Sequence, residues 1–397
     1  MKLRSIFLSS ILLILFSPIG IDIFLPAIPQ MQHELSADTT AIQLSLSLFV
    51  LALGIGQLLV GPLSDRFGRR PVALTGICVY LAASLVIAAV ENPIQLVMFR
   101  ILQGLGASCT SIVAFTIIRD RYSPKEGARI YSYLNGTLNL IPALAPLMGG
   151  VLTVWAGWRS NFYFLALFSA VVLLILFRSL PETRPDSTRH SQLFSFKPYL
   201  EILRNKQFTL YAICAMGAMS VVLSYAFYAP EVLMVQLGLS SIQFGLIFGA
   251  NALVVMASSF VAPFIIQALG RRGSIMIGSI LMLVSGFLIP LLMNHYGTSM
   301  ASFMLPVAIS CCGFAFILGA AASLSLEPFG DCAGTAAALQ GCIQMLGASL
   351  VCILASFLPV IEIFSLAILM LIFGTFGLLI RFWLDRRELQ VAPALNK

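Results

Sequence analysis

Twelve long apolar runs dominate this sequence of 397 residues. A helix needs about 20 such residues to cross the hydrocarbon core of a bilayer. Only 10% of the residues are charged, whereas soluble domains carry about 25%. No run alternates with a period of two, which argues against a β-barrel. We therefore expect an all-α integral membrane protein with twelve transmembrane helices: Ile6–Ile28, Ile42–Leu63, Val72–Ala89, Ile94–Ile118, Ile130–Val151, Phe162–Phe177, Phe208–Ala229, Phe244–Leu269, Ile275–Met293, Phe303–Leu324, Ala336–Phe357 and Ile363–Leu379.

Positive charges lie almost entirely in alternate connections between these runs. If the N-terminus is cytoplasmic, 21 of the 23 Lys and Arg residues fall in inner segments, Arg159 falls in an outer loop and Arg100 falls inside a span. The positive-inside rule therefore places both termini in the cytoplasm and requires an even number of spans. Membrane topology also explains the net charge of +7, so we expect no nucleic acid partner.

The amino-terminal segment has a basic end and an apolar run, as a signal peptide has. The run continues through Pro18 to Pro29 without a small-residue cleavage pattern, so we expect it to remain as the first span. Seven of the eight cysteines lie in apolar runs and none forms a CxxC pair, which favours helix packing over a metal site. Walker, GxSxG and HExxH motifs are absent, so we expect neither an enzyme nor an ATP-driven pump, and no metal or organic cofactor.

The longest polar segment divides the chain into two sets of six spans. It is rich in Pro, Ser and charge, and it predicts a six-helix bundle at 1–178, a cytoplasmic linker at 179–207 and a second bundle at 208–397 with a short cytoplasmic tail. The halves echo each other, because Gly68-Arg69-Arg70 follows the second span and Gly270-Arg271-Arg272 follows the eighth. Two related halves are typical of secondary transporters, whose site lies between them near mid-membrane.

The connection between the second and third spans carries the most specific motif. It reads GPLSDRFGRRPVAL from Gly61 to Leu74, and we expect the second helix to end at its Gly-Pro pair. The motif resembles the signature of the major facilitator superfamily, Gly-x-Leu-x-Asp-Arg-x-Gly-Arg-Arg, and it occupies the position at which that family carries it.

Further motifs extend this resemblance. Arg100-Ile-Leu-Gln103-Gly104-Leu-Gly106-Ala107 resembles the fourth-span motif of the family, and Ile21 to Pro29 and Pro181-Glu182-Thr183 resemble the ends of spans one and six in twelve-span drug exporters. Ala145-Pro146-Leu-Met-Gly149-Gly150 resembles the Gly-Pro-x-x-Gly-Gly motif of drug:proton antiporters, with Ala145 in place of the first glycine.

The whole set is similar to the Bcr/CflA branch, including its phenicol and MdtL-type multidrug exporters. The resemblance implies the major facilitator fold of two pseudo-symmetric six-helix bundles in the bacterial cell inner membrane. It also implies that the protein works as a monomer in the lipid bilayer and exports small, largely apolar drugs in exchange for protons. The proton would then be the coupling ion.

Asp22 is the only ionisable residue deep in the first span. A carboxyl group there costs roughly 2.5–3.5 kcal/mol on insertion scales, and such residues usually face the bundle interior. Burial raises a carboxyl pKa and a nearby cation lowers it, so we expect this group to exchange a proton near neutral pH. The alternative is a carboxylate that caps local structure, since Asp22 is only seven residues before Pro29.

Arg100, on the fourth span, is the expected partner of Asp22. Both residues lie about 10 Å below the outer boundary at 1.5 Å per residue, and spans one and four are neighbours in the family. Gln103, three residues from Arg100, shares its helix face. Two interpretations stay open: a static Asp22–Arg100 pair that holds the first bundle together, or a pair that opens when Asp22 is protonated.

The loop motif is expected to act as a conformational latch that holds the two halves in the outward-open state. Asp65 lies near the cytoplasmic end of a span and is expected to receive the positive end of a facing helix dipole. The resemblance implies that this helix is span eleven, which begins near Gly334. Arg69 is expected to pair with Asp120. Gly61 is expected to permit close approach and Gly68 a tight turn. The latch residues are thus Gly61, Asp65, Arg66, Gly68, Arg69, Arg70 and Asp120.

Weaker cavity candidates are aromatic and polar residues on the spans that would line the cavity, for which helix packing is the competing interpretation. Asn135 and Asn139 are better candidates because they are four residues apart on one helix face. Glu231, Glu327 and Glu362 lie near span ends and are expected to be interfacial. The remaining candidates are Phe24, Phe115, Tyr225, Tyr228, Asn251, Phe314 and Gln344.

Two other functions remain as alternatives. A major facilitator protein that moves a metabolite such as a sugar or amino acid would show more polar and charged groups on spans seven to ten, where this sequence has few. A polytopic membrane enzyme or receptor would need paired catalytic groups or a large soluble domain. Neither feature is visible in the sequence.

Overall fold

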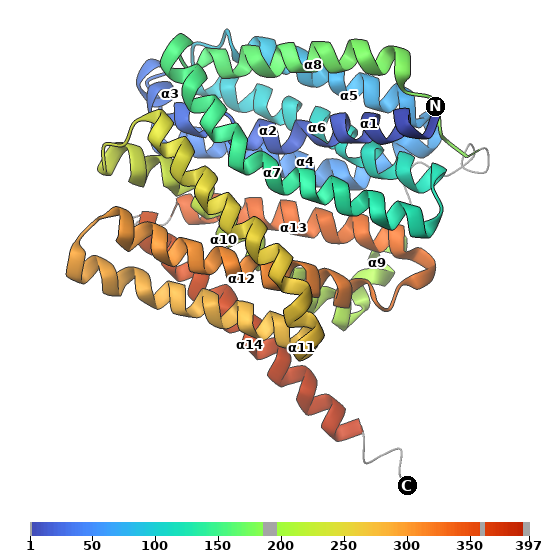
Figure 1. Cartoon of the computed structure of the whole chain (residues 1–397), viewed down its shortest axis with the longest axis vertical. Coiled ribbons are helices and arrows are strands. Elements are labelled where there is room, and N and C mark those ends of the chain that lie inside the picture. Colours follow the sequence, from blue (N-terminus) through green and yellow to red (C-terminus); the bar gives the residue numbers. More distant parts are fainter. Residues whose placement is uncertain (1, 186–196, 358–361, 392–397) are drawn as a thin grey trace. The chain divides into compact units, whose positions relative to one another are not determined.

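The computed structural model describes residues 2–185, 197–357 and 362–391, and every regular element within these ranges is a helix (Figure 1). Eleven of the described helices are long and apolar enough to cross a membrane. One of them, α11 (Ser241–Tyr296), spans 56 residues and bends at Gly270, where φ is +74°. It therefore accounts for spans eight and nine, and the predicted set of twelve transmembrane segments is confirmed.

The remaining helices follow the predicted order. Before α11 they are α1 (Lys2–Ile14), α2 (Phe16–Asp22), η1 (Leu25–Ala27), α3 (Ile28–Glu34), α4 (Thr39–Phe67), α5 (Arg69–Ile87), α6 (Pro93–Arg121), α7 (Pro124–Ala156), α8 (Arg159–Ser179), α9 (Lys197–Arg204), α10 (Lys206–Pro230) and the π-helical turn η3 (Glu231–Gln236). After it come α12 (Met300–Leu326), η4 (Gly330–Cys332), α13 (Ala333–Ser356) and α14 (Glu362–Val391).

Side-chain caps fix where several spans begin. The Asp38 carboxylate accepts the N–H of Ala41 at the start of α4, and Asn92 does the same for Gln95 at the start of α6. Ser123 and Glu126 form a reciprocal capping box at the start of α7. Each cap satisfies backbone donors that the first turn of a helix leaves free.

The first span is interrupted, which differs from the continuous Ile6–Ile28 helix that the hydropathy predicts. The α-helix ends at Asp22, and a 3₁₀ turn at Leu25–Ala27 joins it to α3. Pro26 lacks the N–H that would continue the helix, so the ladder cannot pass this point. Asp22 therefore sits at the end of a helical segment in the middle of the span.

The second helix is longer than predicted. It continues through Pro62 to Phe67, and Gly68 alone separates it from α5. The expectation that it ends at Gly61-Pro62 is therefore wrong. Gly68 has φ of +105°, a backbone conformation that residues with a Cβ rarely adopt, and this one residue makes the turn.

The described chain forms two compact units. The first comprises Met1–Pro198, Ala229–Leu253 and Met345–Phe357, and the second comprises Tyr199–Tyr228, Val254–Gln344 and Leu358–Lys397. Within the first unit, α6 packs closely on α4 and α5: a Cβ on Gly104 would overlap the Phe49 carbonyl, and one on Gly106 would overlap the Gly76 carbonyl. Glycines at these contacts bring α6 close enough to place Arg100 in the middle of the bundle.

Candidate functional site

The side chain of Arg100 is completely buried in the first unit. Its Nη1 donates to the Gly20 carbonyl at 3.0 Å and to Gln103 Oε1 at 2.7 Å. Its guanidinium lies over the rings of Phe24 and Phe49, with 4.2 and 4.6 Å to the centroids. Aromatic faces stabilise a desolvated cation, yet Nε and Nη2 have no hydrogen-bond partner. Arg100 is therefore a buried cation with spare donors.

A chain of polar contacts leads away from Arg100 through the bundle. Gln103 donates to Ser84 Oγ at 2.7 Å, and Ser84 donates to the Tyr80 carbonyl at 2.7 Å. The Tyr80 hydroxyl donates to the Phe16 carbonyl at 3.2 Å. These contacts join α6 to α5 and α5 to α2, so Gln103 fixes the Arg100 guanidinium from one side, as expected from its position three residues away.

Asp22 is buried, with 5% of its surface exposed. Among the described residues it has neither an ion-pair nor a hydrogen-bond partner through its side chain, so the expected Asp22–Arg100 pair is not formed in this structure. Arg100 instead donates to the backbone carbonyl of Gly20 and to Gln103.

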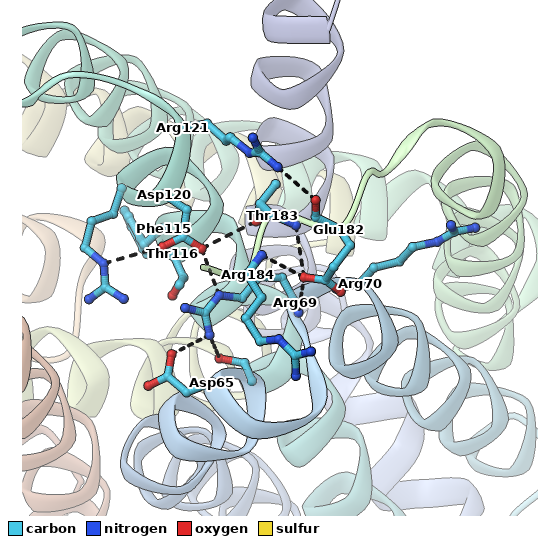
Figure 2. A network of polar contacts seen from close by, with 12 residues as sticks. Asp65, Arg69, Arg70, Phe115, Thr116, Asp120, Arg121, Glu182, Thr183 and Arg184 are labelled. Carbon is cyan, nitrogen blue, oxygen red and sulfur yellow. Dashed lines mark hydrogen bonds and ion pairs between the residues drawn. The ribbon is translucent and has the colours of Figure 1, made fainter. Parts of the chain in front are cut away.

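The Arg69 cluster lies at the opposite end of α6 (Figure 2). Arg69 has no exposed surface, and its Nε donates to Asp120 at 2.9 Å while Nη1 contacts Asp65 and Ser64. Asp120 is 4% exposed. The structure thus joins Arg69 to Asp120, as the sequence analysis expects. The contacts of Arg69 connect the end of α4 with the end of α6.

Glu182, which sequence reasoning did not select, completes this cluster. Its carboxylate accepts the backbone N–H groups of Arg69 and Arg70 at 2.9 and 3.1 Å, so it caps α5 in place of Gly68, which has no side chain. Thr183 and Arg184 donate to the same carboxylate. The only indication of Glu182 in the sequence was the resemblance of Pro181-Glu182-Thr183 to a family motif, and that resemblance did not indicate which groups Glu182 contacts.

Other members of the predicted latch are placed differently. Gly61 is not a point of close approach, because a Cβ there would meet nothing within 4 Å. Arg66 is exposed. Arg70 points away from Asp65 and Asp120 (Figure 2) and donates to the Phe177 carbonyl at 2.7 Å. The role of Asp65 toward span eleven stays a prediction.

The antiporter-like motif on α7 lies at the break in the first span. A Cβ on Gly149 would overlap the Ile23 carbonyl oxygen, and one on Gly150 would overlap the Ser241 carbonyl oxygen. Two glycines of α11 make similarly close contacts, because a Cβ on Gly245 or Gly249 would overlap carbonyl oxygens of α7. The four glycines let α7 touch two backbones closely. Ala145 and Pro146 also belong to this surface, and the methyl of Ala145 is buried without clash.

A second polar cluster in the first unit is centred on Glu34, and sequence reasoning missed it. Glu34 accepts hydrogen bonds from Trp158 Nε1 at 2.8 Å and from Arg159. Gln30 accepts the Trp158 backbone N–H at 3.0 Å. These contacts tie α3 to the turn between α7 and α8. The sequence feature that could have indicated this cluster is Arg159, the one basic residue that the sequence analysis assigned to an outer loop.

The second unit carries an exposed counterpart of the Arg69 cluster. Arg271, next to Gly270, pairs with Glu327 after α12, and Gln207 donates to Glu327 at 3.1 Å. Arg271 and Glu327 are 36% and 47% exposed. Hydrogen bonding from Arg271 outweighs slight burial and lowers the pKa of Glu327. The sequence echo of the two halves therefore reappears as a similar pair, but in contact with solvent.

The weaker candidates are distributed over both units. Phe115 stacks on Tyr131 at 5.7 Å, and Tyr225 lies 6.2 Å from the Phe303 ring. Tyr228 and Asn251 are buried, whereas Asn139, Phe314 and Gln344 are partly exposed. The side chains of Asn135 and Glu362 lie outside the described residues. Among the described residues, no group of three or more His, Cys, Asp or Glu side chains is arranged to hold a metal ion.

Comparisons with known proteins agree with this architecture. A family model described as Major Facilitator Superfamily matches residues 10–352. The multidrug resistance protein MdtL of Escherichia coli O139:H28 is 31% identical over 343 residues, which cover 86% of this chain and 85% of that protein, and MdtL of Shigella flexneri matches to the same extent.

Solved structures share the fold. A D-xylose-proton symporter superposes with a TM-score of 0.77 at 15% identity and covers 95% of this chain and 97% of its own. A POT family transporter gives 0.75 at 14% identity over 97% and 96%. The chain is therefore a multi-pass membrane transporter that belongs to the major facilitator superfamily.

Proposed function

We propose that this protein exports small, largely apolar drugs, including chloramphenicol-type compounds, across the bacterial inner membrane in exchange for protons. The drug assignment is supported by the relatives named multidrug resistance protein, which match 86% of the chain. The energy-coupling assignment is supported by one observation, the buried Asp22 carboxyl group without an ionic partner.

The proton role of Asp22 follows from its surroundings. An ionised carboxylate buried away from water is costly unless a cation or donors compensate it. Asp22 has no such partner among the described residues, so uptake of a proton removes that cost. The interruption of the first span after Asp22 supports the same role, because helix breaks in transporters commonly hold substrate or coupling ions.

Arg100 is the second part of the proposed coupling. Its unpartnered Nε and Nη2 groups are free to receive a carboxylate. We infer that an ionised Asp22 moves to these donors in another state of the transport cycle, and that a protonated Asp22 leaves them. Drug binding then favours one of the two states, which couples the drug to the proton.

The Arg69 cluster is proposed as the conformational latch. It contains a fully buried guanidinium held by Asp120 and Asp65 and a helix cap supplied by Glu182. These contacts make the ends of α4, α5 and α6 one rigid block. A rigid end is what a bundle needs in order to swing as a body during alternating access.

Proteoliposomes test the coupling. Protein reconstituted with an internal pH dye should move protons when chloramphenicol is added, and Asp22→Asn should abolish this signal. Glu91→Gln, which removes an exposed carboxyl group at an outer turn, is the matched control and should transport normally. Unchanged proton coupling in Asp22→Asn contradicts the mechanism, and full transport by Arg69→Ala contradicts the latch.

A further inference from the structure

Several arginines at the Arg69 end of the first unit lack a carboxylate partner among the described residues. Three carboxylates lie nearby, and all are already engaged: Asp65 and Asp120 hold Arg69, and Glu182 accepts backbone N–H groups. Among the described residues, no ion pair involves Arg66, Arg70, Arg178 or Arg184. This end of the bundle therefore presents uncompensated positive charge.

Arg70 contacts an exposed aromatic ring at the end of α8, and Arg178 is the next residue in the sequence. The Arg70 guanidinium lies 5.8 Å from the centroid of Phe177 and donates to its carbonyl at 2.7 Å. Arg178 follows directly and is exposed. Phe177 is 62% exposed. An aromatic ring beside guanidinium groups is typical of the boundary between acyl chains and headgroups.

An apolar stripe continues from Phe177 along the outer face of α8. Its exposed residues recur at helical spacing, so they line up on one side of the helix. The adjoining helix α5 also presents smaller exposed residues, including Thr75 and Cys78. The stripe consists of Leu167, Val171, Leu174 and Phe177.

We propose that this surface, formed by Arg70, Arg178 and the α8 stripe, binds an anionic phospholipid. The phosphate lies between the two guanidinium groups, and an acyl chain lies along Leu174, Val171 and Leu167. Arginine forms bidentate hydrogen bonds with phosphate oxygens, and basic residues at the membrane surface attract anionic lipids. Arg69 takes no part, because its side chain is completely buried and paired with Asp120 and Asp65.

Native mass spectrometry of the full chain in neutral detergent tests the proposal. Dioleoyl phosphatidylglycerol should bind with lower half-saturation than dioleoyl phosphatidylcholine. Arg70→Gln/Arg178→Gln should raise the half-saturation for phosphatidylglycerol about tenfold, because two charges near the headgroup are lost. Lys197→Gln/Arg204→Gln on α9 removes the same charge from exposed positions and should change it less than twofold.

Each other result overturns the proposal. If the α9 control weakens phosphatidylglycerol binding equally, the attraction is diffuse and not a defined site. If Arg70→Gln/Arg178→Gln does not weaken the binding, the lipid does not bind at these two arginines. Displacement of the lipid by equimolar glycerol 1-phosphate indicates a site for free phosphate. Because Arg70 also contacts Phe177 in the fold, Arg178→Gln alone is measured with its melting temperature. Arg178→Gln should have the melting temperature of the parent protein and should still bind phosphatidylglycerol more weakly than the parent does.

Discussion

The carboxylate of Glu182 accepts the backbone N–H of Arg69 at 2.9 Å, although 113 residues separate them in the sequence. It occupies the place that an N-cap side chain takes in most helices, because the actual N-cap, Gly68, has none. The positive φ of Gly68 and the cap from Glu182 are therefore complementary. The turn needs glycine, and the helix after it needs an acceptor from elsewhere.

Removing this acceptor should destabilise the first bundle. Glu182→Ala leaves the first two N–H groups of α5 without a partner and should lower the free energy of unfolding by about 0.5–2 kcal/mol. Glu182→Gln keeps an acceptor oxygen and should lose less. Unfolding in mixed micelles measures both. Glu201→Ala, at an exposed position of α9, should stay within about 0.5 kcal/mol of the parent.

The contribution of Glu182 should depend on pH. Burial raises the pKa of Glu182, but hydrogen bonds from the N–H groups of Arg184, Arg69, Arg70 and Thr183 outweigh it, so the pKa lies below the ordinary 4.5. A lowered pKa in the folded state gives stability that is present above the unfolded-state pKa and is lost as pH falls through the folded-state pKa.

The stability difference between the parent and Glu182→Ala should therefore be constant between about pH 6 and 8 and should shrink below about pH 4. Unfolding at a series of pH values measures it. A difference that grows on acidification would show that the carboxylate does not cap α5 in its ionised form.

The two related arginine pairs should differ in strength. Asp120→Ala removes the partner of a fully buried Arg69 and should cost about 3–5 kcal/mol. Glu327→Ala removes the partner of Arg271 in a solvent-exposed pair and should cost no more than about 1 kcal/mol. Added salt should weaken the second pair only. Equal costs would contradict the burial difference between the two clusters.

The glycines of α7 should respond oppositely to alanine. At Gly149 a methyl group meets the Ile23 carbonyl oxygen, and backbone cannot move aside cheaply, so Gly149→Ala should cost about 1–3 kcal/mol or more. At Gly136 nothing lies within 4 Å, so Gly136→Ala should stabilise the helix by up to about 1 kcal/mol. Thermal unfolding of the two variants compares them directly.

Gln103→Glu tests whether Asp22 uses the unpartnered guanidinium N–H groups of Arg100. The variant keeps an oxygen at the atom that accepts from Nη1 and adds a carboxylate whose negative charge is stabilised by the adjacent guanidinium. It should fold, but it should lose drug-coupled proton movement because Asp22 no longer gains from approaching Arg100. Gln103→Met, which adds no charge, should fold and retain more coupling. Normal coupling in Gln103→Glu would show that Arg100 is not the partner of Asp22.

Much of the architecture follows from local signals in the sequence. Apolar length sets the spans, and Gly68 and Gly270 mark turns because both adopt positive φ. The Arg69–Asp120 contact could be predicted from the sequence because both residues flank predicted spans at the same end. These features depend on one segment at a time or on the family motif.

Other features depend on how side chains are directed around a helix. Asp22 and Arg100 lie at similar depth, yet depth alone does not show that Arg100 donates to the Gly20 carbonyl and not to Asp22. Glu182 is separated from its partners by four spans, α5 to α8, and nothing in its neighbourhood indicates a cap for α5. Pro62 was expected to end a helix, but α4 continues through it, because spans tolerate proline when neighbouring groups satisfy the backbone.

The bend at Gly270 has a consequence for how the chain enters the membrane during synthesis. The insertion machinery meets the 56 residues of α11 as nearly unbroken apolar sequence, and only Arg271 and Arg272 mark its middle. A helical hairpin with so short a connection is expected to insert as a single unit, with the two arginines as its retention signal. Replacing both arginines with neutral residues is therefore expected to invert the hairpin or to leave it uninserted, even though neither arginine is part of the proposed transport site.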